Sequence, residues 1–278
     1  MQMREPPVPA VPGCQATVVS GLRAGAAFER LDWVAQELPV ALEYNGISHA
    51  VMLATPSDLE DFAVGFSRTE GIVDDVAQIF GVEQVESAQG YTLSLDIASS
   101  CLSRLKERRR SLAGRTGCGL CGTESLEHAL RMPVALPSGA RFEAAAVARA
   151  LAGMRDRQFL LGVTGATHAA AWCGAAGDIA LVREDVGRHN ALDKLVGALL
   201  RGRLPAAEGF ILITSRASYE MVQKAATVGV TVLAAVSGVT ALAIDVAHNA
   251  GLALLGFARG DDVCIYSHAE RVQLQPTP

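Results

Sequence analysis

The C-terminal half of the chain alternates short apolar runs with amphipathic stretches of helical period. The apolar runs predict strands at 159–164, 179–183, 210–214, 231–236, 252–257 and 263–266. Helical patterns lie between several of these runs, at 190–200, 218–228 and 240–249. Strands that are apolar on both faces and alternate with helices are typical of a largely parallel sheet covered on both sides. Residues 141–278 are therefore predicted to form an α/β domain.

The N-terminal half predicts a smaller α+β domain over residues 26–140. Asn45-Gly46 separates two strand-like runs and predicts a hairpin, because both residues tolerate positive φ. Ser57 and Glu60 then have the spacing of a capping box at the start of a helix. Gly71 is expected to end that helix.

The rest of the N-terminal half changes character along its length. Two strand-like runs, 81–86 and 91–97, precede a basic run over 104–115 that leads into a glycine-rich linker. Prolines after this linker place the expected domain boundary near residue 140. Residues 1–25 are rich in Pro, Gly and Ala and are expected to be a flexible leader.

Composition excludes several classes of protein. Half of the 278 residues are apolar and only 5% are aromatic, so a large aliphatic core is expected. The formal net charge of −5 does not fit a general nucleic-acid binder. Six cysteines are too few for a disulfide framework in a chain of this length. No run has the length of a signal peptide's apolar region or of a membrane span, so we expect a cytosolic protein without membrane contact.

The sharpest local feature is Cys118-Gly119-Leu120-Cys121, within the glycine-rich linker. A thiolate is the reactive form of cysteine, and nearby positive charge lowers a thiol's pKa. A thiol on such a linker suits sulfur transfer through a persulfide. Three other interpretations stay open: a zinc site, which lacks a second cysteine pair, a thioredoxin-like motif, which should begin a helix after a strand, and two incidental cysteines.

A dense cluster of charges follows the predicted strand at 179–183. A strand that opens onto a helix N-terminus is where α/β proteins bind phosphates and nucleotides. Arg188 and Lys194 are candidates for phosphate, and Asp185 or Asp193 for a base or sugar. The alternative is a turn held by ion pairs.

Three further loops follow predicted strands. Residues 214–220 carry hydroxyls and Arg216 at a helix start, which suits an anion, although an ordinary N-cap explains them as well. Residues 256–260 end another apolar strand. The carboxyl ends of parallel strands share one edge of a sheet, so these loops are expected to converge with 183–194 on one pocket. His168 lies in the remaining loop, where a ligand or an acid/base group is one interpretation and a hydrogen-bonded core histidine is the more common case.

Together these motifs resemble the formate dehydrogenase accessory sulfurtransferases (FdhD family). The resemblance runs from about residue 37 to 267. The matching stretches are 58–66, 70–72, 118–122, 164–171, 184–190, 193–194, 215–224, 256–260 and Tyr266.

The resemblance implies that a cysteine desulfurase loads sulfur onto Cys118 as a persulfide, with Cys121 as its partner thiol. The sulfur would then pass to the molybdenum (or tungsten) bis(molybdopterin guanine dinucleotide) cofactor of formate dehydrogenase. It also implies a three-layer, cytidine-deaminase-like α/β/α fold for the C-terminal half, and a homodimer. The residues expected to contact this guanine-nucleotide-bearing cofactor are Phe257, Ala258, Arg259, Gly260, Asp261, Asp262, Arg188, His189, Asp193, Lys194, Ser215, Arg216 and Lys224.

Two departures limit what the resemblance implies. A basic residue is expected near position 262, but the sequence has Asp261-Asp262, so a phosphate contact from Asp262 is doubtful. Zinc deaminases need His-X-Glu followed later by Cys-X-X-Cys. Here His168 is followed by two alanines, and the cysteine pair comes before it. We therefore expect neither deamination nor a permanently bound metal.

Two rival functions remain. A non-catalytic chaperone of the molybdenum cofactor would use the same pocket but would not need Cys118. A thiol-disulfide oxidoreductase would have a dithiol redox couple and no affinity for nucleotides.

Overall fold

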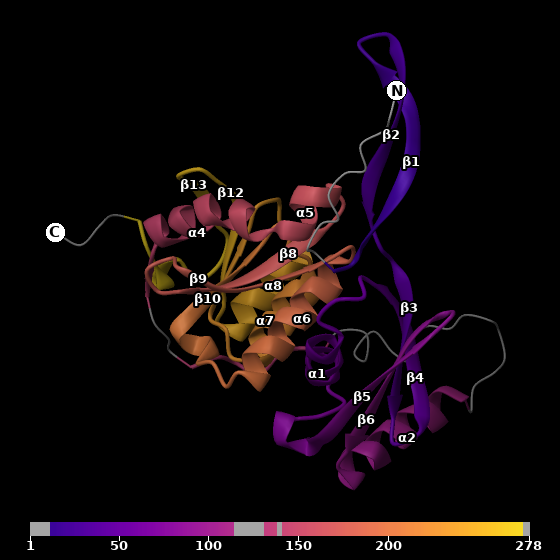
Figure 1. Cartoon of the computed structure of the whole chain (residues 1–278). Coiled ribbons are helices and arrows are strands. Elements are labelled where there is room, and N and C mark those ends of the chain that lie inside the picture. The colour runs from indigo at the N-terminus through magenta and orange to yellow at the C-terminus, as the bar shows by residue number, and fades with distance from the viewer. Residues whose placement is uncertain (1–11, 114–130, 138–140, 275–278) are drawn as a thin grey trace.

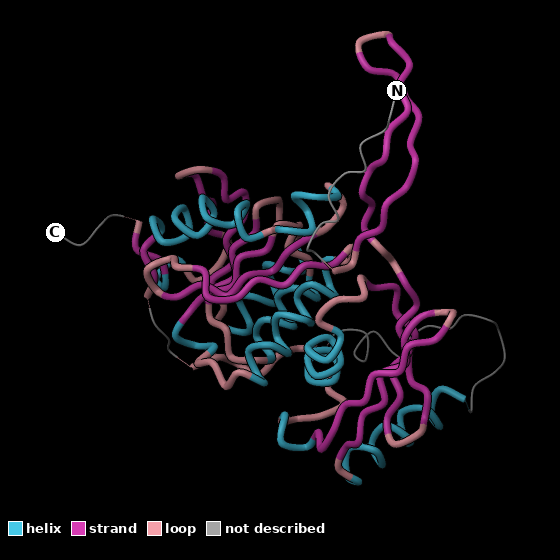
Figure 2. Tube along the Cα trace, viewed as in Figure 1, coloured by secondary structure: helices cyan, strands magenta, loops and turns pink. Residues whose placement is uncertain are grey.

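The computed structural model describes residues 12–113, 131–137 and 141–274 (Figure 1). Three parts are visible: a projecting hairpin, a four-stranded sheet with helices on one face, and a six-stranded sheet between two helical layers (Figures 1 and 2). None of the helices in these ranges combines the length and the apolar character that a membrane crossing requires.

Strands β1 (Cys14–Arg23) and β2 (Ala26–Ala35) form an antiparallel ribbon that projects from the body (Figure 1). Ala24 and Gly25 turn the chain with φ of 50° and 81°. The expectation of a flexible leader is therefore wrong for residues 14–25, whereas residues 1–11 lie outside the described part. The sequence signal for these strands is weak because small and polar residues are frequent in both of them. Apolar cross-strand pairs such as Val18 and Leu31 become visible only in the structure.

The second sheet has the order β4-β3-β6-β5. Its strands are β3 (Leu38–Tyr44), β4 (Ile47–Ala54), β5 (Ile79–Ser87) and β6 (Gly90–Ile97). The predicted hairpin is confirmed, since Asn45 and Gly46 have φ of 48° and 75°. Helices α1 (Leu59–Thr69) and α2 (Ser99–Ala113) contribute to the same apolar core as this sheet. The short helix η1 (Val76–Gln78) connects α1 to β5.

Helix α1 begins and ends near the predicted residues, but the capping box is wrong. The N-cap is Asp58, which has a left-handed backbone (φ 51°) and no side-chain capping bond. Its carboxylate instead lies 3.5 Å from Arg183. The helix ends at Thr69, and its C-cap residue Glu70 directly precedes Gly71, whose φ is 61°.

The six-stranded sheet has the order β13-β12-β11-β10-β8-β9. These strands are β8 (His168–Gly174), β9 (Ile179–Asp185), β10 (Gly209–Ile213), β11 (Val232–Ala235), β12 (Ala253–Arg259) and β13 (Asp262–Ile265). Only the pairs β10–β11 and β11–β12 are parallel, so the prediction of a largely parallel sheet is wrong. The sheet is mixed because β8 and β9 form an antiparallel pair next to β10.

Helices cover both faces of this sheet. On one face lie α6 (Arg188–Arg201), α7 (Tyr219–Thr227) and α8 (Ala241–Ala250), and on the other α4 (Ala144–Arg157) and α5 (Phe159–Thr164) (Figure 1). Smaller elements are η2 (Ala206–Glu208), η3 (Ala269–Arg271) and the parallel pair β7 (Phe142–Glu143) and β14 (Val272–Gln273). The elements predicted for the C-terminal half agree in type with the structure and in bounds within a few residues, except at 159–164. Strand β8, helix α4 and the short elements were not predicted.

Residues 159–164 are helix α5 and not a strand. A short apolar run does not distinguish a buried strand from a helix by periodicity. The carboxylate of Glu184 accepts hydrogen bonds from the Leu160 and Leu161 amides, both at 2.8 Å, and so caps the helix from a strand more than twenty residues away. The strand of this region is β8, whose alanines have low intrinsic strand propensity.

The two halves of the chain meet where α1 packs against α6. Asp61 of α1 binds Arg183 at 2.7 Å and Arg201 at 2.5 Å. The predicted boundary at residue 140 lies outside the described residues and stays a prediction.

Candidate functional site

Four strands, β9, β10, β11 and β12, place their carboxyl ends on one edge of the six-stranded sheet, and β8 lies between β9 and β10. Strands β10, β11 and β12 are mutually parallel, and β9 has the same direction because both β9 and β10 are antiparallel to β8. Strand β8 begins at this edge, where His168 pairs with Asp185. The predicted strand ends therefore share one edge of the sheet, although the sheet is mixed. Their loops do not line one pocket, because Thr214, Arg183 and Gly260 border three different cavities.

A cavity of about 590 Å³ opens at this edge on the α4–α5 side. Its polar lining includes Arg155, Gln158, His168 and Thr214, and its apolar lining includes Leu161 and Val236. No carboxylate lies among its described lining residues. The cavity has the size of a small-molecule site, and its charge favours a ligand with acceptor or anionic groups.

Gln158 is a buried polar residue of this cavity, with a donor that is unpartnered within the described part of the chain. It ends α4 and is the N-cap residue of α5. It is only 6% exposed, and its Nε2 has no hydrogen-bond partner among the described residues. A buried amide donor without a partner is costly, so this group is available to a ligand oxygen.

His168 lies at the same cavity with an altered pKa. Burial, and then the charge of Arg188, lower the pKa of His168 below its ordinary value. The imidazole is therefore neutral near pH 7 and can both donate and accept a hydrogen bond.

The first residues of α6 and α7 lie at the same sheet edge but on the other face of the sheet, opposite to α4 and α5. Neither N-cap residue, Gly187 or Ser218, makes a side-chain capping bond. The Nε of Arg188 and the Oγ of Ser218 are buried without a partner among the described residues. Two uncapped helix N-termini and unpartnered donors favour an anion.

His189 and Glu220 join these two helix starts, with Nε2 and Oε2 2.5 Å apart. Burial lowers the pKa of His189, and the nearby cations Arg188 and Lys224 add to this shift, while Glu220 acts in the opposite direction. Arg216 is exposed at the same edge, and the Oγ of the buried Ser215 donates to the Arg216 carbonyl at 3.1 Å.

Lys194 lies away from any ligand surface. Its side chain is fully buried, and its Nζ lies 2.7 Å from Asp185, 2.9 Å from the Thr55 carbonyl and 3.3 Å from the Glu184 carbonyl. An ammonium has three donors, so none remains for the phosphate that the sequence suggested. Lys194 instead ties α6 to β9 and to the loop before α1.

Lys224 and Asp193 form a second buried pair. The Nζ of Lys224 lies 2.9 Å from both Asp193 oxygens and 3.0 Å from Glu70 and Thr69. Burial lowers the pKa of Lys224, but Asp193 and Glu70 raise it by more, so the net shift is upward. We assign these residues a structural role, which corrects the expectation that they contact a cofactor.

Residues 257–262 comprise the end of β12, the turn at Gly260 and Asp261, and the first residue of β13. Phe257 has a left-handed backbone (φ 52°), is 42% exposed, and stacks 5.8 Å from the guanidinium of Arg259. Gly260 and Asp261 line a second hollow of about 490 Å³ beside α4, and Leu151 of α4 lines both hollows. Ala258 is buried in the core, and Asp262 is exposed. The segment therefore adjoins the main cavity without lining it.

Cys118 and Cys121 lie outside the described residues. The chain re-enters the described part at Arg131, whose N–H donates to the Tyr219 hydroxyl at 2.6 Å. The Arg131 guanidinium also contacts the backbone carbonyl and the carboxylate of Glu70. The segment after the cysteines thus joins the structure one residue away from Glu220.

Sequence reasoning missed Arg155 and Gln158. Both follow the apolar stretch 144–151, which gave no signal of a site. The cavity is completed by residues of 161–168 and by Thr214 and Val236, which follow strands more than 50 residues later. Among the described residues, no group of three or more His, Cys, Asp or Glu side chains is placed to hold a metal ion.

Comparison with known proteins identifies the family of the chain. The model of the FdhD/NarQ family matches residues 35–273. A "Sulfur carrier protein FdhD" from Variovorax paradoxus is 57% identical over 97% of both chains, and one from Bordetella petrii is 54% identical over 97% of this chain and 98% of the relative. A crystal structure of a formate dehydrogenase accessory protein from Desulfotalea psychrophila has the same fold, with a TM-score of 0.75 at 22% identity, over 94% of this chain and all of that one. The chain is a member of the FdhD/NarQ family.

Proposed function

We propose that this protein is a sulfurtransferase that carries persulfide sulfur from a cysteine desulfurase to the molybdenum bis(molybdopterin guanine dinucleotide) cofactor of formate dehydrogenase. The observation that carries the proposal is the sulfur-carrier name of relatives more than half identical over nearly the whole chain. The Cys118–Cys121 pair supplies the thiols that such a role needs.

The first step is thiol exchange at Cys118. The Cys118 thiolate attacks the terminal sulfur of the donor's persulfide. The S–S bond to the donor breaks, its electron pair leaves with the donor thiolate, and a new S–S bond forms on Cys118. The terminal sulfur keeps its oxidation state, so the step needs no external oxidant. Cys121 then acts either as a relay or as a resolving thiol.

The cofactor is the substrate of the second step, and the sheet edge offers groups suited to its nucleotide arms. Gln158 offers a buried donor to a carbonyl oxygen of the base. Arg155 and Arg188 offer positive charge to phosphate, and the exposed face of Phe257 offers a stacking surface. Lys194 and Lys224 are excluded from this list by their buried ion pairs.

Transfer of labelled sulfur tests the proposal against the cofactor-chaperone alternative. The protein is incubated with a cysteine desulfurase and 35S-cysteine, then analysed on non-reducing gels with a thiol-release control. We expect label on the wild type that is lost in Cys118→Ala. A chaperone would protect the cofactor and remain active as Cys118→Ala.

A further inference from the structure

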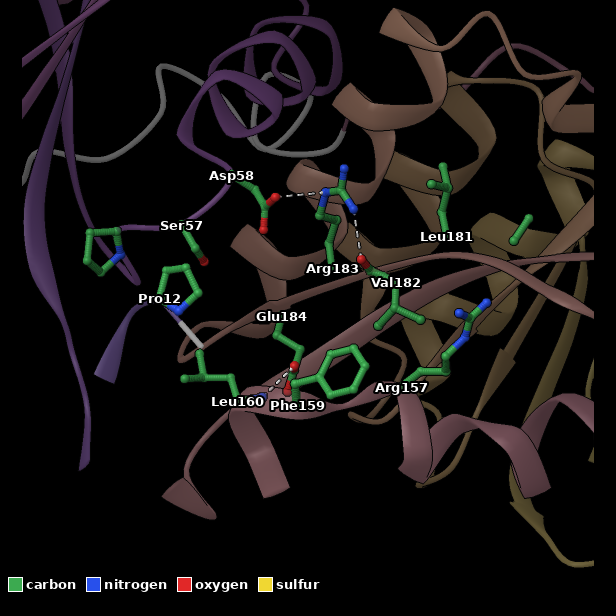
Figure 3. A pocket seen from close by; sticks show the side chains of 12 residues that line it. Pro12, Ser57, Asp58, Arg157, Phe159, Leu160, Leu181, Val182, Arg183 and Glu184 are labelled. Carbon is green, nitrogen blue, oxygen red and sulfur yellow. Dashed lines mark hydrogen bonds and ion pairs between the residues drawn. The ribbon is translucent and has the colours of Figure 1, made fainter. Parts of the chain in front are cut away.

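Another cavity of about 590 Å³ lies along the unpaired side of strand β9. It is distinct from the cavity that contains Gln158 and from the hollow beside Gly260. Strand β9 is the last strand of the six-stranded sheet, so within the described residues no strand pairs with its outer side. Figure 3 shows Pro12 and Leu160 at one end of this cavity and Arg157 at the other, with Phe159 between them. The cavity therefore follows the length of the unpaired strand.

Its lining combines an exposed aromatic ring with one unpaired cation. Phe159 borders the cavity and is 62% exposed, so its ring is open to an occupant of the cavity. Arg183 is paired with Asp58 and Asp61, and Glu184 accepts from the Leu160 and Leu161 amides. Arg157 donates to the Ile179 carbonyl at 2.5 Å but has no carboxylate within ion-pair distance among the described residues.

The chain itself supplies a segment of matching chemistry. Pro12, the first described residue, is part of the cavity wall, so residue 11 is one peptide bond from it. Residues 5–11 read Glu-Pro-Pro-Val-Pro-Ala-Val. Proline fixes φ and holds the residue before it in extended conformations, so little conformational entropy opposes docking as an extended strand.

The alternation of these residues suits one particular edge. In an extended chain Val8 and Ala10 share one side and keep their N–H groups, whereas Pro7 and Pro9 on the other side have none. In the middle of the segment, donors therefore face one side, and Glu5 and Val11 keep donors on the proline side only at its ends. The side with Val8 and Ala10 would pair with β9, and Pro7 and Pro9 would interrupt the donors of the outer side, which disfavours pairing with a further strand.

Length and charge agree with this placement. Seven residues of extended chain span roughly 22 Å, and the five residues of β9 that line the cavity span roughly 16 Å. A segment that leaves Pro12 and runs along β9 therefore brings the Glu5 carboxylate to the region of Arg157.

We propose that residues 5–11 of this chain dock along the free edge of β9, cover Phe159 and pair Glu5 with Arg157. Helix α5 separates this cavity from the one that contains Gln158, since Phe159 and Leu160 face one cavity and Leu161 and Gly162 the other. The docked segment therefore supports the wall of the candidate cofactor cavity from behind. This inference is independent of sulfur transfer.

A cycle of thermal unfolding measurements tests the docking. We compare the full chain with a deletion of residues 2–11, each in wild-type, Phe159→Ser and Phe80→Ser backgrounds. Phe80 is 72% exposed on β5 and serves as the matched control. The deletion should lower Tm by about 4 °C in the wild type and in Phe80→Ser, but by less than about 1 °C in Phe159→Ser. An equal loss in all three backgrounds overturns the proposal.

Amide hydrogen exchange gives a second readout that does not depend on the substitutions. We expect the amides of residues 180–182 to exchange at least about tenfold faster in the deletion than in the full chain. Unchanged exchange overturns the docking. Protection that disappears on tenfold dilution would identify the segment of a second copy, or another chain, as the occupant and would overturn the intramolecular arrangement.

Discussion

Gly65 of α1 and Gly197 of α6 lie at the point where the two helices cross. A Cβ on Gly65 would overlap the carbonyl oxygen of Asp193, and a Cβ on Gly197 would overlap that of Asp61. The backbones of the two halves of the chain are therefore in direct contact. This close approach allows Asp61 of α1 to reach Arg183 and Arg201 of the C-terminal half.

Substitution of either glycine by alanine should weaken the junction. We expect Gly65→Ala and Gly197→Ala each to lower the free energy of unfolding by about 1–3 kcal/mol or more, because the overlap is with backbone atoms. The measurement is urea denaturation followed by circular dichroism. Gly153→Ala in α4 is the control, since its Cβ would lie 3.6 Å from Ile179. A loss in Gly153→Ala as large as in the other two variants would contradict this account.

Removal of one partner of the Lys224–Asp193 pair should be strongly destabilising. We expect Lys224→Met to cost about 3–5 kcal/mol, because it leaves Asp193 buried without its counter-charge. The double variant Lys224→Met/Asp193→Leu should be more stable than Lys224→Met alone. Arg30→Ala, which removes an exposed pair with Asp32, should cost less than about 1 kcal/mol. A double variant less stable than Lys224→Met would count against a buried ion pair.

The two histidines of the sheet edge predict a dependence of stability on pH. Burial lowers the pKa values of His168 and His189 in the folded state, whereas in the unfolded state they are near 6.5. Below about pH 6.5 the unfolded chain therefore binds more protons than the folded one, so stability falls with falling pH and levels off above it.

Urea denaturation at pH 5.5, 6.5 and 7.5 measures this dependence. The drop from pH 6.5 to 5.5 should be smaller in His168→Asn than in the wild type, because one of the two depressed groups is gone. Identical drops in both proteins would show that His168 does not contribute.

The Gln158 cavity predicts a pattern of nucleotide affinity. With GDP as the probe in titration calorimetry, Gln158→Leu should weaken binding about tenfold, because a buried hydrogen bond is lost. Arg155→Leu should weaken binding as well. Arg157→Leu, two residues further along α4 and facing the β9 cavity, should leave the affinity unchanged. Equal effects of Arg155→Leu and Arg157→Leu would place the nucleotide elsewhere.

Features with a local physical cause could be predicted from the sequence. Asn45-Gly46 forms its turn because of the backbone freedom of these two residues, and α6 follows from the spacing of its own apolar side chains. Helix α5 could not be predicted, because its state depends on the Glu184 carboxylate, which binds its first amides from another element.

The same distinction applies to the site. The shared edge of the strand ends follows from strand direction, and it was predicted. That the loops of this edge line separate cavities was not predicted. The burial of Lys194 and Lys224 was not, because it depends on the crossing of α1 and α6, which brings Thr55, Thr69 and Glu70 against them. Charged residues in a loop-to-helix segment have the same sequence pattern whether they face a ligand or a second domain.

The most direct test of the central claim starts from protein that already carries labelled persulfide sulfur. This protein, separated from the desulfurase, is mixed with formate dehydrogenase that contains its cofactor but is inactive, and both label transfer and formate oxidation are measured. Cys264→Ala, which removes an exposed cysteine of β13, is the matched control for Cys118→Ala. The account predicts transfer of label and activation with wild type and Cys264→Ala, and neither with Cys118→Ala. Activation by Cys118→Ala without transfer of label would contradict sulfur transfer and support the cofactor-chaperone function.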